Sequence, residues 1–344
     1  MDIQTVYFLL IGAIISAYAI LDGYDLGVGA IYPFLKDDKQ RSIAIEAIAP
    51  FWDGNEVWIV IAGGGLIAGF PDVYASVFSG FYVPVILLLF CLIFRAISIE
   101  NRGHASSANS VLFWDIAFSV SSILIAFIFG LLVGNLMVGV PLLSNGNFEG
   151  GLLALFRPYP VIVGVLTVVL LSIHGIIFLL IKVPKDMISR LKKIHHRMLI
   201  VFSILFALLG GITYKYIPSA FLNYYYSPVL FLVPLMLFLF LWLELYSVKR
   251  SHYNISLLHS SITICLVLMI FAASLYPNIV VSSIDIEYSL NIYNASSSLF
   301  TLKILLIITV LAIPSVFAYL ITRKKVFSGR IESTHFYEKE DNSI

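Results

Sequence analysis

The 344-residue sequence has few charged residues for its length. Charged residues make up 12% of the chain and apolar residues 60%, whereas typical soluble domains have about 25% and about 45–50%. The 21 Lys and Arg and the 20 Asp and Glu leave a net charge of +1, so no global field exists that would attract nucleic acid. This composition excludes an ordinary soluble globular protein, and no nucleic-acid partner is expected.

Cysteine and histidine are also scarce. Cys91 and Cys265 lie far apart in apolar runs, which excludes a disulfide framework, a CxxC redox pair and a thiolate metal site. Five of the seven histidines fall in predicted loops or the tail, His195 among them, and His174 and His259 lie at different depths of apolar runs. A haem needs histidines at matching depth on facing helices. The sequence therefore favours a hydrogen-bonded interior His174 over a haem ligand, and predicts no metal site.

Long apolar runs are what the sequence does have. About 20 apolar residues in a helix cross the hydrocarbon core of a bilayer, and nine runs of this kind predict an all-α integral membrane protein with nine transmembrane helices. The first run contains two aspartates and no Lys or Arg precedes it, so it is expected to stay in the mature protein. The predicted spans cover residues 7–31, 52–70, 75–97, 114–139, 159–182, 198–217, 226–247, 256–276 and 299–322.

The basic residues alternate between the predicted loops. Of the 21 Lys and Arg, 18 fall in every second loop and in the tail, and Arg157, Lys215 and Lys303 are the others. Because basic loops stay in the cytoplasm, the amino terminus is predicted outside and the carboxyl terminus in the cytoplasm. Residues 1–322 would form one transmembrane domain, and residues 323–344 a polar cytoplasmic tail.

A faint internal repeat accompanies this pattern. Gly12 precedes the Asp22-Gly23 pair by ten residues, and Gly164 precedes His174-Gly175 by the same distance. Two four-helix bundles, spans 1–4 and 5–8, plus one peripheral helix would fit. Three matched positions in apolar sequence are weak evidence, and chance similarity between two glycine-containing membrane helices explains them more simply.

Acidic residues inside the spans are the main candidates for function, because a charge in hydrocarbon needs a partner or water. Asp22 and Asp25 are three residues apart on one helix face, and Asp22 lies about 13 Å from the end of the first span, near mid-membrane. Asp53 and Glu56 have the same spacing in the first turns of the second span. The two pairs predict a proton path from the cytoplasm. The same residues fit three alternatives: Asp53 caps a helix, Asp25 pairs with a loop lysine, or the carboxylates form the cation site of a transporter.

Other charged residues near the span ends have simpler explanations. Arg95 ends the third span and Asp115 begins the fourth, so they could pair across the connecting loop, although snorkelling of Arg95 is an equal alternative. Glu244, beside Lys249 and Arg250, is expected to snorkel.

Several segments resemble subunit II of the cytochrome bd family of quinol oxidases. The resemblance runs from the first span to the ninth, and its first two segments are the most specific. The segments are LDGYDLGVG, APFWDGNEVW with its GGG run and PDVYASVFSGFY, LIFRA, FWD, GNLMVGVP, HGIIFLLIK, YPNIV and NASSSLFTL.

The resemblance implies a part of a bacterial cytoplasmic-membrane enzyme that oxidises quinol and reduces dioxygen to water. Two b-type haems and one d-type haem would belong to subunit I, the partner in a heterodimer, and this chain would ligate none. The carboxylates of its proton path would be Asp53 and Asp22, with Asp25 and Glu56 as helpers, and Arg95 would pair with a carboxylate or a haem propionate. The resemblance does not decide whether a small single-span accessory subunit joins the complex, or whether this chain binds a quinone or a lipid.

Three hypotheses follow. The chain is the haem-free subunit of a bd-type oxidase, supporting assembly and proton uptake. Alternatively it is an ion-coupled secondary transporter that uses the same carboxylates, which would show broken helices and an inverted repeat. The third hypothesis is a purely structural assembly partner whose carboxylates have no catalytic role.

Overall fold

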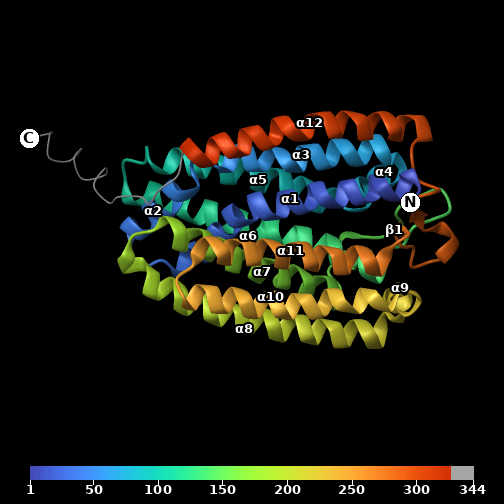
Figure 1. Ribbon diagram of the computed structural model, residues 1–344. Coiled ribbons are helices and arrows are strands. Elements are labelled where there is room, and N and C mark those ends of the chain that lie inside the picture. The colour runs from blue at the N-terminus through green and yellow to red at the C-terminus, as the bar shows by residue number, and fades with distance from the viewer. Residues whose placement is uncertain (327–344) are drawn as a thin grey trace, which may run out of the picture.

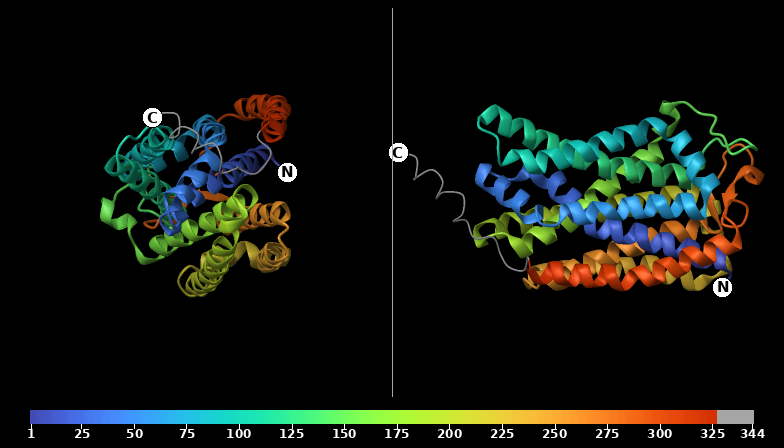
Figure 2. Two further views of the ribbon diagram at one scale, coloured as in Figure 1. Left: turned by 90° about the vertical axis from the view of Figure 1, so that its left-hand side faces the viewer. Right: turned by 90° about the horizontal axis from the view of Figure 1, so that it is seen from above.

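The computed structural model describes residues 1–326 and shows long helices running side by side along one axis (Figure 1). Figure 2 shows the same bundle end-on and from above. The long helices are α1 (Ile3–Ile31), α3 (Trp52–Gly69), α5 (Tyr82–Arg102), α6 (Ala108–Val138), α7 (Pro158–Lys182), α8 (Lys185–Tyr216), α10 (Leu232–Lys249), α11 (Tyr253–Leu275) and α12 (Leu299–Val326). The short elements are α2 (Asp38–Ile48), α4 (Pro71–Gly80), α9 (Leu222–Tyr226) and an antiparallel pair, β1 (Asn278–Val280) and β2 (Leu290–Asn291).

Seven helical segments in the described part of the chain are long and apolar enough to cross a membrane. Their mean hydropathy ranges from 1.9 to 2.7, and many of their large apolar side chains are exposed, as expected where lipid replaces water. The chain is therefore an integral membrane protein. The seven segments are Ile3–Phe34, Tyr82–Arg102, Ala108–Val138, Pro158–Lys182, Lys185–Tyr216, Pro228–Lys249 and Tyr253–Leu275.

Helix α7 lies at the centre of the bundle, packed against α1, α6, α8 and α11. Two glycines allow α1 and α7 to cross closely. A Cβ atom on Gly27 would lie 1.9 Å from the carbonyl oxygen of Leu171, and one on Gly175 would lie 2.4 Å from the backbone of Gly27. Membrane helices use such small residues because close backbone approach strengthens their packing. The crossing fixes α1, and with it the acidic residues of its second half.

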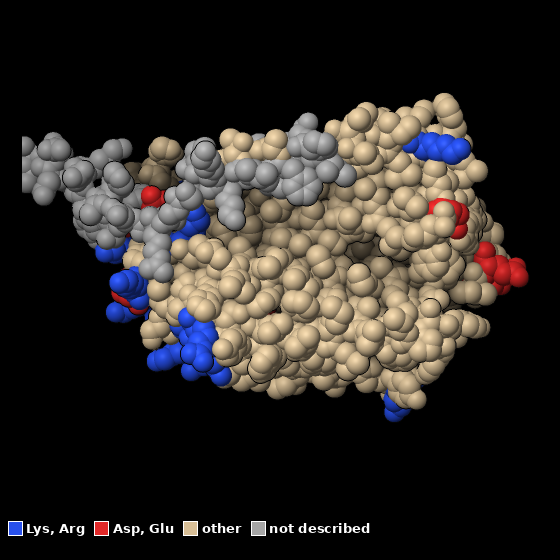
Figure 3. Space-filling view, in the orientation of Figure 1, with Lys and Arg blue, Asp and Glu red and all other residues tan. Residues whose placement is uncertain are grey.

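The two ends of the bundle differ in charge. The N-terminus lies at one end and α2 at the other, hereafter the α2 end (Figure 1). In Figure 3, Lys and Arg gather at the α2 end, while the long middle surface is almost free of charge. This distribution matches the division of basic residues between alternate loops.

Helix boundaries differ from the predicted spans at several positions. The predicted span 75–97 is divided at Phe81 between α4 and α5. Helix α4 begins at Pro71, a position where proline is tolerated because the backbone N–H of a first-turn residue has no partner within the helix. The predicted loop before residue 198 is helical, because α8 begins at Lys185. The predicted tail, 323–344, begins in the last turn of α12 and from residue 327 lies outside the described residues.

Candidate functional site

A buried arginine joins three helices near the α2 end. The Arg95 guanidinium, on α5, donates from Nη1 to the Asp22 carboxylate of α1 at 2.9 Å and from Nη2 to Glu56 of α3 at 3.1 Å. The Arg95 and Asp22 side chains are completely buried, and the Glu56 side chain is 22% exposed. We call these three residues the Arg95 cluster. Arg95 does not snorkel, because its planar guanidinium can bind two carboxylates at once.

A second polar group lies next to the Arg95 cluster. Asn55 of α3 is 1% exposed, and its Nδ2 atom lies 2.7 Å from Oδ2 of Asp25, 2.6 Å from the Tyr24 hydroxyl and 3.0 Å from the Leu21 carbonyl oxygen. These contacts tie α3 to the second half of α1. Asn55 is a site residue that the sequence reasoning missed, although its position between Asp53 and Glu56 was a signal.

The predicted path residues differ in their exposure to solvent. Asp53 is exposed in the first turn of α3, Glu56 is partly buried three residues later, and Asp22 and Asp25 are completely buried on α1. The N-cap of α3 is Phe51, so Asp53 is not the capping residue. The structure thus brings Asp22 and Glu56 together through Arg95. Asp53 stays exposed on α3, the helix that also carries Glu56.

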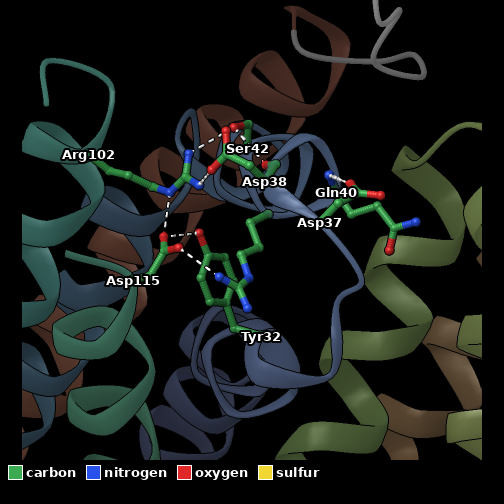
Figure 4. A network of polar contacts seen from close by, with 8 residues as sticks. Tyr32, Asp37, Asp38, Gln40, Ser42, Arg102 and Asp115 are labelled. Atoms are coloured by element: carbon green, nitrogen blue, oxygen red, sulfur yellow. Dashed lines mark hydrogen bonds and ion pairs between the residues drawn. The ribbon is translucent and has the colours of Figure 1, made fainter. Parts of the chain in front are cut away.

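Asp115 belongs to a different network, at the α2 end (Figure 4). Its carboxylate accepts hydrogen bonds from Arg102 Nε at 2.6 Å, from Arg41 Nη1 at 3.2 Å and from the Tyr32 hydroxyl at 2.7 Å. Arg102 also donates to Asp38 of α2 at 2.6 Å. The Arg95–Asp115 pairing considered from the sequence is therefore wrong. A closer arginine, Arg102, ends the same helix and reaches Asp115.

Three buried side chains bear on the predictions for histidine and glutamate. His174 Nε2 lies 2.9 Å from the Ile20 carbonyl oxygen, so it donates, and Nδ1 accepts from the Ser260 hydroxyl at 2.6 Å; neither nitrogen is left for a metal. His195 is buried inside α8 rather than in a loop, and its Nε2 lies 2.9 Å from Glu244. Glu244 is 1% exposed, so the prediction that it snorkels is wrong.

The part of the chain that the structure describes contains no group of three or more His, Cys, Asp or Glu residues that could hold a metal ion. It does contain an apolar cavity of about 1510 Å³ beside the Arg95 cluster. Tyr18 and Glu56 are polar residues of its wall, and α1, α3, α5, α7 and α11 supply most of the rest. The site therefore consists of carboxylates that are completely or partly buried next to an open apolar pocket.

Comparison with known proteins identifies the family. The family model described as cytochrome bd terminal oxidase subunit II matches residues 3–327. The chain belongs to this family. The bd subunit II family implies that the chain is a component of a quinol oxidase complex, with haem in a partner subunit I.

Relatives of the bd subunit II family match nearly the whole chain. The "Probable cytochrome oxidase subunit 2" of Haemophilus influenzae is 28% identical, with 99% of this chain and 98% of the relative covered. "Cytochrome bd-I ubiquinol oxidase subunit 2" of Escherichia coli K12 is 28% identical, with 92% of each covered. "Cytochrome bd ubiquinol oxidase subunit 2" of Bacillus subtilis is 27% identical, with 94% and 97% covered.

The bd oxidase structure from Geobacillus thermodenitrificans has the same fold. One of its chains superimposes with a TM-score of 0.76 at 18% identity, covering 96% of this chain and all of that chain. This likeness concerns the fold, whereas the match to the family model identifies the chain as a bd subunit II.

Proposed function

We propose that this chain is the haem-free subunit of a bd-type quinol:dioxygen oxidoreductase and conducts protons from the α2 end toward the oxygen-reducing haem of subunit I. The single observation that carries the proposal is the Arg95 cluster: two carboxylates share one guanidinium in a buried position. If both carboxylates were ionised, the cluster would hold a net charge of −1 around a completely buried Arg95 and Asp22, with only the Glu56 side chain, 22% exposed, in reach of water. A buried net charge is costly, so binding of one proton neutralises the cluster.

The order of exposure supplies a direction for proton movement. Protons would enter at exposed Asp53, pass to partly buried Glu56 three residues along α3, and reach Asp22 of the Arg95 cluster. Asp25, held by Asn55 at 2.7 Å, would be a helper beside this route. Water bridging between these carboxylates would complete the transfer.

The proposed topology places this route on the side that supplies protons. In this topology, α3 and α12 cross the membrane together with the seven apolar segments, which makes nine spans. The spans form two four-helix bundles, and α12 lies at the periphery. The α2 end is cytoplasmic and the amino terminus is outside, because the basic loops lie at the α2 end. Protons taken from the cytoplasm then combine with electrons from quinol, and moving one charge inward is worth about 2.3 kcal/mol per 100 mV.

We further propose that the apolar cavity of about 1510 Å³ holds a bound quinone or lipid. Its wall is almost entirely apolar and it lies beside the Arg95 cluster, which suits a long isoprenoid or acyl tail. Two b-type haems and one d-type haem are assigned to subunit I, and a small single-span accessory subunit would bind outside this chain. Extraction and mass analysis of the purified complex would identify the tail.

The proton path is tested by oxygen consumption of the assembled complex. Asp53→Asn and Asp22→Asn should slow quinol-driven oxygen consumption at least about tenfold and leave the haem content unchanged, and Asp53→Glu should restore most of the rate. Asp186→Asn is the matched control, because Asp186 is also an exposed aspartate in the first turn of a long helix at the α2 end. Unchanged turnover in Asp53→Asn and Asp22→Asn would remove both residues from the path.

A further inference from the structure

Charge is divided unevenly between the two halves of the α2 end. In the first half, Arg41, Arg95 and Arg102 are all ion-paired with carboxylates, and the two lysines Lys36 and Lys39 have no ion-pair partner among residues 1–326. In the second half, seven Lys and Arg residues have no ion-pair partner among residues 1–326, and Asp186 is the exposed acidic residue beside them. We call these seven residues the basic rim: Lys185, Arg190, Lys192, Lys193, Arg197, Lys249 and Arg250.

A cavity opens within the basic rim. It has a volume of about 440 Å³ and lies between Ile181, at the end of α7, and residues 251–255, which lead from α10 into α11. Ser251, His252 and Asn254 provide its exposed polar groups. Lys192 places its ammonium group at the cavity, because Nζ donates to the Ser251 hydroxyl at 2.9 Å.

The helices above the basic rim present an apolar and aromatic surface. On α11, Ile255 is 50% exposed and Leu258 is 58% exposed. On α10, Trp242 and Tyr246 are exposed and stacked, with ring centroids 5.9 Å apart, and the Arg250 guanidinium lies 5.5 Å from the Tyr246 ring. Trp and Tyr concentrate at the level of lipid headgroups, so the cavity lies at that level.

We propose that the basic rim and its cavity bind an anionic phospholipid. The phosphodiester would lie against Lys192, Ser251 and Arg250, and the acyl chains would follow Ile255 and Leu258 along α11. Basic residues tend to stay on the cytoplasmic side, which explains an excess of Lys and Arg in all the loops at the α2 end. It does not explain why the first half pairs its arginines and leaves only Lys36 and Lys39 without an ion pair, while the second half leaves seven cations without one among residues 1–326.

Lipid fits this surface better than a soluble acidic partner does. The cations lie next to exposed apolar side chains, so the surface matches both the charged head and the apolar tail of a lipid. An acidic protein surface would contact the cations and leave the apolar side chains uncovered. Each Lys or Arg near a membrane surface contributes about 1 kcal/mol toward anionic lipid. Lys192, held at the cavity by Ser251, and Arg250, next to Ser251 in the sequence, would supply this attraction to the bound lipid.

The test uses the detergent-purified oxidase complex and native mass spectrometry. Titration with phosphatidylglycerol should show a tightly retained lipid in the unmodified complex, and Lys192→Gln/Arg250→Gln should weaken that binding about 30-fold. Lys36→Gln/Lys39→Gln is the matched control, because it removes two exposed cations from the first half of the same end and should leave binding unchanged. Phosphatidylcholine, which carries no net charge, should not compete.

Three outcomes would overturn the proposal. Equal retention of phosphatidylglycerol by Lys192→Gln/Arg250→Gln and the unmodified complex would show that the basic rim does not bind it. Equal weakening in Lys36→Gln/Lys39→Gln would show a general charge effect rather than a site. Complete displacement of the lipid by inorganic phosphate would show that the cavity binds free phosphate, with no contribution from Ile255 and Leu258.

Discussion

Removal of the Arg95 guanidinium is the most informative perturbation of the buried site. Arg95→Met keeps the apolar volume but leaves Asp22, completely buried, and Glu56, 22% exposed, without their cation. Breaking a buried ion pair by deleting one partner costs about 3–5 kcal/mol, because the remaining charge is uncompensated. Arg95→Met should therefore lower the thermal unfolding midpoint of the purified complex and the amount of assembled complex in the membrane.

Two further variants separate charge from packing. Arg95→Met/Asp22→Asn removes a cation and an anion together, so it should be less destabilising than Arg95→Met alone. The loss in Arg95→Met should also shrink as pH falls, because protonation neutralises the two carboxylates. The assay is the unfolding midpoint across pH, with Lys36→Gln as an exposed control. A midpoint for Arg95→Met equal to that control would refute the assignment of Arg95 as the shared counter-ion.

Three other perturbations test separate parts of the structure. Gly175→Ala should destabilise the complex by about 1–3 kcal/mol, because its Cβ would meet the Gly27 backbone at 2.4 Å; Gly63→Ala, which meets nothing within 4 Å, should not, as thermal unfolding would show. Asp115→Asn should loosen α2, since it removes the shared anion of Arg41 and Arg102, and limited proteolysis near residues 36–48 should become faster. His174→Leu should lower the unfolding midpoint but leave the haem-to-protein ratio unchanged, because both ring nitrogens already have protein partners; loss of one haem per complex would contradict this.

The sequence predicts the helices well, because a membrane span is a local property. Apolar runs of about 20 residues mark it without knowledge of any neighbour. Boundaries are less predictable where a helix extends beyond the membrane, as α8 does from Lys185, or where a span is interrupted, as at Phe81. His195 was misplaced for the first reason, since polar residues around it resemble a loop.

The sequence singles out the residues that the structure brings together in the Arg95 cluster, but not how they pair. The spacing of Asp22 with Asp25, and of Asp53 with Glu56, identifies one helix face each. Which cation they meet depends on how α1, α3 and α5 pack, and two arginines of α5, Arg95 and Arg102, both end near carboxylates. Only the tertiary structure assigns Arg95 to Asp22 and Arg102 to Asp115.

The oxidase assignment depends most directly on the partner of this chain, and purification from native membranes tests that partnership. An affinity-tagged chain should co-purify with a larger haem-bearing subunit, and the eluate should show the absorption bands of b-type and d-type haem together with quinol-driven oxygen consumption. Recovery of the chain alone, stable, without haem and able to take up a solute in an ion-dependent manner, would contradict the oxidase assignment and favour a transporter.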